Sequence, residues 1–123
     1  MTTTNTLREI KRSNASRNYL EHIDETVRAM RALSLEELLF GNTTRDARDL
    51  ATEIEEARGF CEAIGGTEGE VLKRHYIEGY TYTDIARDMA YSERQITRFA
   101  MRGRVAMFDY LEPYWQHSVL LAS

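Results

Sequence analysis

The chain has 123 residues, of which 42% are hydrophobic and 29% are charged, and its formal net charge is −4. This length suits one small domain, and the negative balance argues against a protein that coats nucleic acid through overall charge alone. One cysteine excludes an internal disulfide, and no stretch approaches the ~20 apolar residues that a membrane-spanning helix needs. Because the amino terminus also lacks the apolar core of a secretory signal, we expect a cytoplasmic protein.

The first third of the chain is expected to be helical. Apolar residues recur at steps of three and four within residues 7–33, which predicts one buried helix face. We expect the polar run at 13–16 to weaken or break this helix. Ser34 with Glu37 forms a capping-box pair, which predicts a separate short helical turn that ends at Gly41.

A second long helix is expected to begin after Thr43, which has Asp46 at the capping-box position. Its inward positions alternate steps of three and four residues, the spacing of a coiled-coil seam. A helical hairpin within one chain and a homo-oligomer, with a dimer favoured, both fit this seam. The candidate oligomerisation residues come from the seam and from the tail of the chain: Leu50, Ile54, Ala57, Cys61, Ile64 and Trp115.

Gly65 and Gly66 predict the end of that helix and a boundary within the chain. We expect a helical amino-terminal part at residues 1–65, for packing or oligomerisation, and a module at 66–112 that opens with a supporting helix. The tail at 113–123 begins with the only proline and is apolar, so we expect it to dock on other parts of the protein. Because strand signals are absent, the predicted fold class is all-α.

Residues 81–102 predict two short helices joined by a tight turn. Thr81 with Asp84, and Ser92 with Gln95, place a capping box at the start of each helix. This is the layout of a helix-turn-helix, in which the second helix enters the major groove of DNA.

The interior of this helix pair carries suitable residues. Ala86 is small enough for the two helices to cross closely, and Ile96 supplies an apolar contact between them. Ala90 stands at the turn, where many such motifs carry glycine because the backbone adopts a positive φ. From Ser92 to Arg104, four arginines accompany one acid, a local charge of +3. Local charge matters more than the total for DNA contact, because charges act over about 10 Å at moderate salt.

The segment EGEVLKRHYIEGYTYTDIARDMAYSERQITRFAMRGRVAMFDYL, about residues 67–111, resembles region 4 of bacterial sigma factors. It is more similar still to phage-encoded regulators of the ArpU and RinA type, which carry that module behind a helical amino-terminal part. The resemblance implies a sigma region 4-like helix-turn-helix in a transcription regulator, phage or prophage encoded, that activates late genes. It also implies double-stranded DNA as a partner, and RNA polymerase as a further one.

We expect base contacts from the exposed positions of the second helix, because arginine can bond guanine and threonine can meet a thymine methyl group. These positions are Ser92, Glu93, Arg94, Thr97, Arg98 and Met101. Phosphate contacts, which position the protein without reading sequence, are expected from the surrounding basic and capping residues. These are Lys73, Arg74, Thr81, Arg87, Arg102 and Arg104.

Two other functions stay open. A phage small terminase subunit, which recognises packaging-site DNA, also joins a helix-turn-helix to oligomerising helices, and it assembles rings. A sigma-like module could instead bind RNA polymerase without binding DNA. Ring formation in solution, or polymerase binding that survives loss of DNA binding, would distinguish these alternatives from a DNA-binding regulator.

A catalytic function has no support in the sequence. His22, His75 and His117 are scattered, without a second ligand at metal-binding spacing. Cys61 has no histidine near it in sequence, and no glycine-rich phosphate loop is present. We therefore expect no enzyme activity, no metal and no cofactor.

Overall fold

The computed structural model describes residues 3–40 and 45–116, with side chains described at 7–33 and 47–112. All regular secondary structure in these ranges is helical, so the expected all-α class is confirmed for the described part of the chain. The elements are α1 (Thr3–Phe40), α2 (Arg45–Ile64), α3 (Gly66–Leu72), the π-helical segment η1 (Lys73–Ile77), α4 (Tyr82–Met89) and α5 (Glu93–Gln116).

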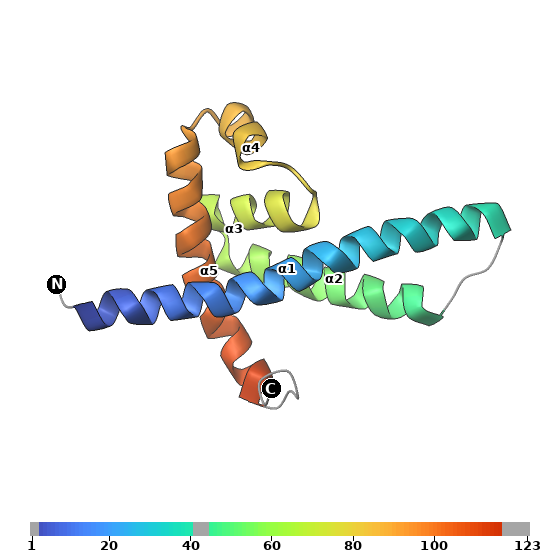
Figure 1. Ribbon diagram of the computed structural model, residues 1–123, viewed down its shortest axis with the longest axis horizontal. Coiled ribbons are helices and arrows are strands. Elements are labelled where there is room, and N and C mark those ends of the chain that lie inside the picture. The colour runs from blue at the N-terminus through green and yellow to red at the C-terminus, as the bar shows by residue number, and fades with distance from the viewer. Residues whose placement is uncertain (1–2, 41–44, 117–123) are drawn as a thin grey trace.

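Helix α1 forms the long axis of the molecule, and the other helices pack along it (Figure 1). α2 runs antiparallel to the second half of α1, whereas α5 crosses its first half. α3, η1 and α4 gather on one side of α1, beside the first half of α5 (Figure 1). This arrangement brings α1 and α5, which lie at opposite ends of the sequence, into direct contact.

Helix α1 is continuous through both places where the sequence predicted an interruption. Ser13 and Ser16, in the polar run, are 1% and 0% exposed, and they extend the buried face of α1 that continues to Leu20. Their small side chains allow α5 to cross closely, and this packing outweighs their weak helix propensity. The separate turn predicted at Ser34 is also wrong, because a helix that has already formed extends at little cost.

The predicted seam of α2 is used inside the chain. Ala57 and Cys61 are 0% and 2% exposed, and Ile54 and Ile64 pack against the same core. The oligomerisation interpretation is therefore wrong for Ala57 and Cys61, because other helices of the same chain already cover them. Leu50 is half-buried, and the side chain of Trp115 lies outside the described residues.

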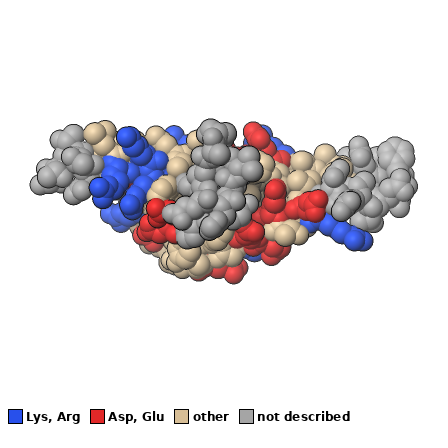
Figure 2. Space-filling view, turned by 90° about the horizontal axis from the view of Figure 1, so that it is seen from below, with Lys and Arg blue, Asp and Glu red and all other residues tan. Residues whose placement is uncertain are grey.

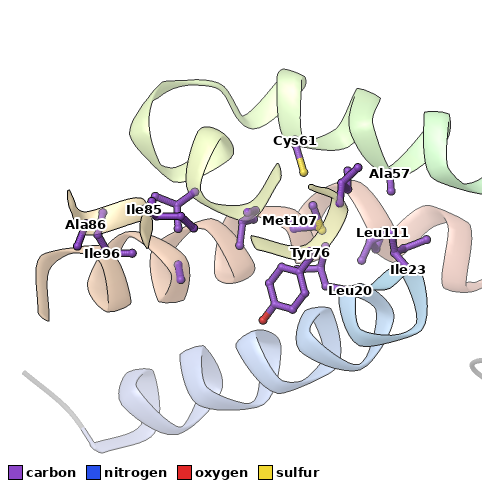
Figure 3. Packing of buried hydrophobic residues seen from close by; sticks show 14 residues of the cluster. Leu20, Ile23, Ala57, Cys61, Tyr76, Ile85, Ala86, Ile96, Met107 and Leu111 are labelled. Atoms are coloured by element: carbon purple, nitrogen blue, oxygen red, sulfur yellow. The ribbon is translucent and has the colours of Figure 1, made fainter. Parts of the chain in front are cut away.

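One hydrophobic core joins the described helices (Figure 3). Figure 3 shows Leu20 and Ile23 of α1 close to Leu111 of α5, with Cys61 of α2 above Met107. The core therefore continues across residues 65 and 66, which form the expected boundary between helices but not a division in the packing.

Gly65 and Gly66 have φ values of +67° and +60°, a backbone conformation that favours glycine. They turn the chain sharply from α2 into α3. Gly69, one helical turn later, is buried directly against the backbone of Cys61, so α3 begins in tight contact with the end of α2. This turn directs the segment 66–77, the expected supporting helix, towards α5.

Candidate nucleic-acid interface

Helix α4 has well-defined ends. At its start, the Asp84 backbone N–H donates to Thr81 Oγ1 at 3.1 Å, which confirms the predicted cap. At its end, the Tyr91 N–H donates to the Ala86 carbonyl oxygen at 2.9 Å. Between these bonds Ala90 adopts φ 60° and ψ 41°, the left-handed conformation that glycine usually provides. The turn thus has the backbone conformation that glycine favours, although it carries alanine.

Helix α5 begins with the predicted capping box. The Gln95 N–H donates to Ser92 Oγ at 3.2 Å, and the Ser92 N–H donates to Gln95 Oε1 at 2.9 Å. The Thr83 hydroxyl also donates to the Glu93 carboxylate, which links α4 to the first turn of α5. The start of α5 is therefore fixed both by its own cap and by a side-chain bond to α4.

Apolar packing holds α4 against α5. Ile85, Ala86 and Ile96 are 1%, 5% and 0% exposed, and Figure 3 shows them together at one end of the core. The rings of Tyr91 and Phe99 meet edge to face with their centres 5.0 Å apart. The predicted inward positions of Ala86 and Ile96 are confirmed, and they direct the opposite face of α5 outwards.

The outward face of α5 contains most of the predicted base-reading residues. Arg94, Thr97 and Arg98 are exposed, and Met101 is half-buried. Ser92 and Glu93 are exposed as well, but the first serves the cap and the second accepts the bond from α4. The Thr97 hydroxyl donates to the Glu93 backbone carbonyl oxygen at 2.9 Å, so its methyl group is the part that can contact a partner. The residues of this face with the most freedom are therefore Arg94 and Arg98.

Arg104 contradicts the prediction of a phosphate contact. Its residue is 5% exposed, its Nε donates to Ser13 Oγ at 3.0 Å, and its Nη1 donates to the Tyr82 hydroxyl at 3.4 Å. The prediction is wrong because α1 crosses α5 at this level and covers the side chain. Arg104 instead connects α1, α4 and α5 in the interior.

The other residues predicted to contact phosphate differ in whether their side chains already form ion pairs. Arg102 is exposed and forms no ion pair with the described residues, and Thr81 is exposed beside the start of α4. Arg87 pairs with Asp84 on α4, with an N–O distance of 2.7 Å. The hydrogen bond from Thr81 and the neighbouring charge of Arg87 lower the pKa of Asp84.

Lys73 and Arg74 both pair with Glu70, at N–O distances of 3.2 and 2.8 Å, and both are half-buried. The hydrogen bond from Arg74 lowers the pKa of Glu70, so this carboxylate keeps its charge at neutral pH. These two cations would have to exchange a carboxylate for a phosphate in order to contact DNA.

A cavity of about 680 Å³ lies between α1 and the segment Gly79–Tyr82, and Thr97 of α5 forms part of its wall. Its α1 side carries arginines that the sequence analysis did not consider, because α1 was treated only as a packing helix. A signal was present: charged residues recur on α1 at steps of four and three residues. They are Arg17, Glu21, Asp24, Arg28 and Arg31, and all of them line the cavity.

Charge is also uneven elsewhere on the surface. Figure 2 shows Lys and Arg gathered towards the amino-terminal end of α1, where the sequence carries Arg8, Lys11 and Arg12. Asp and Glu are more frequent towards the middle of the same face (Figure 2). The net negative charge of the chain is therefore compatible with basic areas on its surface.

Within the described ranges, no group of three or more His, Cys, Asp or Glu side chains is placed to hold a metal ion. No described helix is both long and apolar enough to cross a lipid bilayer. Comparisons of the chain with protein-family models, curated proteins and solved structures find no match. The resemblance of residues 67–111 to sigma region 4 therefore stays a prediction carried by those residues.

Proposed function

We propose that this protein is a sequence-specific, double-stranded DNA-binding transcription regulator, phage or prophage encoded, that activates late genes. In this proposal α4 and α5 act as a helix-turn-helix, and α5 is the recognition helix. The observation that carries it is the exposed face of Arg94, Thr97 and Arg98 at the fixed start of α5.

The shape of this face suits a major groove. An α-helix with its side chains is about 10–12 Å across, and the major groove of B-DNA is about 12 Å wide. Arg94 and Arg98 are four residues apart, so they lie on the same side of α5. A guanidinium can donate two hydrogen bonds to the O6 and N7 atoms of one guanine, which gives each arginine a base to read.

Helix α4 supplies contacts that position α5. Thr81 stands at the start of α4, and Arg87 is exposed on it. The bond from Thr83 to Glu93 keeps the two helices in one arrangement. A helix pair that is already ordered loses little conformational entropy on binding, which favours affinity.

The packaging alternative receives less support than the regulator. A terminase subunit that forms rings needs a surface for self-association, and the seam of α2 was the sequence candidate for that surface. Ala57 and Cys61 of the seam are buried within the chain and are not available for such contacts.

Selection of bound duplexes from a random pool, followed by binding measurements with variants, tests the proposal. Arg94→Ala and Arg98→Ala should each weaken binding by about 1–3 kcal/mol, which raises Kd roughly 5- to 150-fold. Each variant should also relax the preference at one base pair. Arg48→Ala on α2 is a matched control, because Arg48 is also exposed but lies on a different helix. Unchanged affinity and preference in both α5 variants would overturn the assignment of α5 to the groove.

A further inference from the structure

The charged side of α1 faces a cavity that the DNA-reading face of α5 also borders. The cavity occupies about 680 Å³, and its wall includes Arg17 and Arg31 of α1 and Thr97 of α5. Thr97 is one of the exposed residues that we propose to read bases. The arginines of α1 are therefore next to the proposed recognition helix, although they are far from it in sequence.

The cavity wall has an excess of positive charge. Four arginines line it with only two carboxylates, and one of these, Asp24, already pairs with Arg28 at an N–O distance of 3.1 Å. Arg17 and Arg31 form no ion pair with any described residue, and both are exposed. They are the two cations of this wall that are free to bind an anion.

Arg104 adds a fixed positive charge from the interior. Its side chain is buried, it lines the cavity, and its hydrogen-bonding partners are the neutral hydroxyl groups of Ser13 and Tyr82. In a partly buried site such a charge is weakly screened and attracts an anion into the cavity without touching it.

The shape of the arginine row favours a polyanion over a single ion. Arg17 and Arg31 are fourteen residues apart on one continuous helix, which places their Cα atoms about 21 Å apart at ~1.5 Å per residue. At the far end, the guanidinium of Arg31 lies beside Gly79: its Nη2 atom is 3.8 Å from the position that a Cβ on Gly79 would take. A helix in the major groove has a sugar-phosphate strand on each side, so phosphates are expected beside α5, where this cavity lies.

We propose that this cavity binds phosphate groups of the DNA strand that flanks α5, with Arg17 and Arg31 as the contacting residues. Helix α1 is then part of the DNA interface, in addition to its packing in the core. The inference rests on the proposed function, because DNA is taken as the source of the phosphates. The recognition of phosphate groups is argued from the cavity itself.

The salt dependence of DNA binding by the full chain tests this assignment. Each phosphate contact contributes about 0.9 to the slope of log Kd against log salt concentration. Arg17→Ala and Arg31→Ala should each lower that slope by about one such contribution, and the double variant by about two, with base preference unchanged. Arg48→Ala on α2 removes the same charge from an exposed position outside the cavity and should leave the slope unchanged. A double variant with the slope and affinity of the parent would overturn the inference, while loss of binding in Arg98→Ala would still support the proposed function.

Inorganic phosphate provides a second measurement, which separates a DNA strand from a free anion as the ligand. If the parent binds no duplex, the proposed function fails, and so does the assignment to DNA phosphates. A phosphate-dependent rise in Tm that is present in the parent and absent from the double variant would then assign the cavity to a free phosphate ion. If phosphate has no such effect either, the cavity is not a phosphate site.

Discussion

Two buried serines on α1, three residues apart, differ in their hydrogen bonding. Ser13 accepts a hydrogen bond from the Arg104 guanidinium at 3.0 Å, whereas Ser16 Oγ has no partner among the described residues. A hydrogen bond to a charged group contributes about 1.5–3 kcal/mol, and an unsatisfied buried polar group costs about 1–3 kcal/mol. The same substitution at the two positions should therefore have opposite effects.

We expect Ser13→Ala to lower the free energy of unfolding by about 2 kcal/mol, because the buried guanidinium loses a partner. Ser16→Ala should raise that free energy by about 1 kcal/mol, because it removes the unsatisfied hydroxyl. Urea unfolding followed by circular dichroism measures both changes, and each variant controls for the volume change in the other. Equal changes in the two variants would contradict the role assigned to the Ser13–Arg104 bond.

Because of Cys61, the free energy of unfolding should fall as the pH rises above 9. Burial raises the pKa of its thiol from 9.0 to about 12, so the folded protein keeps the thiol neutral where the unfolded chain ionises it. The stabilising contribution is complete below pH 9 and is lost as the pH rises from 9 to 12. The expected loss at pH 10 is about 1 kcal/mol.

Cys61→Ala is the matched variant for this measurement, because it removes the titrating group from the same buried position. Burial also raises the pKa of Tyr76 from 10.0 to about 12, but that contribution is common to both proteins. The free energy of unfolding should therefore fall less steeply between pH 8 and about 10 in Cys61→Ala than in the parent. Parallel curves would show that the thiol is not buried as described.

At the scale of the elements, two glycines differ in the space that is available for a side chain. A Cβ added at Gly69 would clash with the backbone carbonyl oxygen of Cys61, where α3 meets α2. A Cβ at Gly59, in the middle of α2, would have no atom within 4 Å. Gly69→Ala should destabilise the protein by about 3 kcal/mol, because the backbones must separate. Gly59→Ala should stabilise it by about 1 kcal/mol, because alanine favours a helix interior.

Thermal unfolding of the two glycine variants compares them directly, with expected shifts in Tm of opposite sign. A stable Gly69→Ala protein would mean that α3 and α2 are not in the tight contact described. A destabilised Gly59→Ala protein would mean that other atoms pack against α2 at Gly59.

The sequence was most informative where short-range rules decide the structure. The caps at Thr81 and Ser92 depend on hydrogen bonds between residues three positions apart, and both were predicted correctly. The outward face of α5 followed from the spacing of its apolar residues, for the same reason. The starts of α4 and α5 could therefore be predicted closely, whereas α5 continues past Pro113, where the tail was expected to begin, to Gln116.

Features that depend on contacts between distant residues could not be predicted in this way. Ser13 and Ser16 were read as a weak point of a helix, although they are buried where α1 meets α5. Arg104 was read as a surface cation, because the sequence does not reveal that α1 covers it. The arginines of α1 were missed for the same reason: their relation to α5 exists only after the two ends of the chain have packed together.

At the scale of the whole molecule, the continuous core means that the carboxy-terminal module depends on the amino-terminal helices. Leu20 and Ile23 of α1 and Ala57 of α2 belong to the same cluster as Leu111 of α5. We therefore expect a fragment of residues 66–123 to be largely unfolded, because it lacks the core residues that α1 and α2 contribute. Circular dichroism and a thermal scan of the fragment, beside the full chain, measure this. A cooperative transition in the fragment would contradict the single core.

The bond between Ser13 and Arg104 joins residues that are 91 positions apart in the chain. During synthesis at ~5–20 residues per second, α1 leaves the ribosome about 5–18 s before its partner on α5 has been made. Throughout that interval the nascent chain carries the apolar face around Leu20 and Ile23 without the helix that completes its burial. Slower translation of the segment that follows α1 should therefore increase the binding of chaperones to unfinished chains. Faster translation of the codons for α5 should reduce that binding.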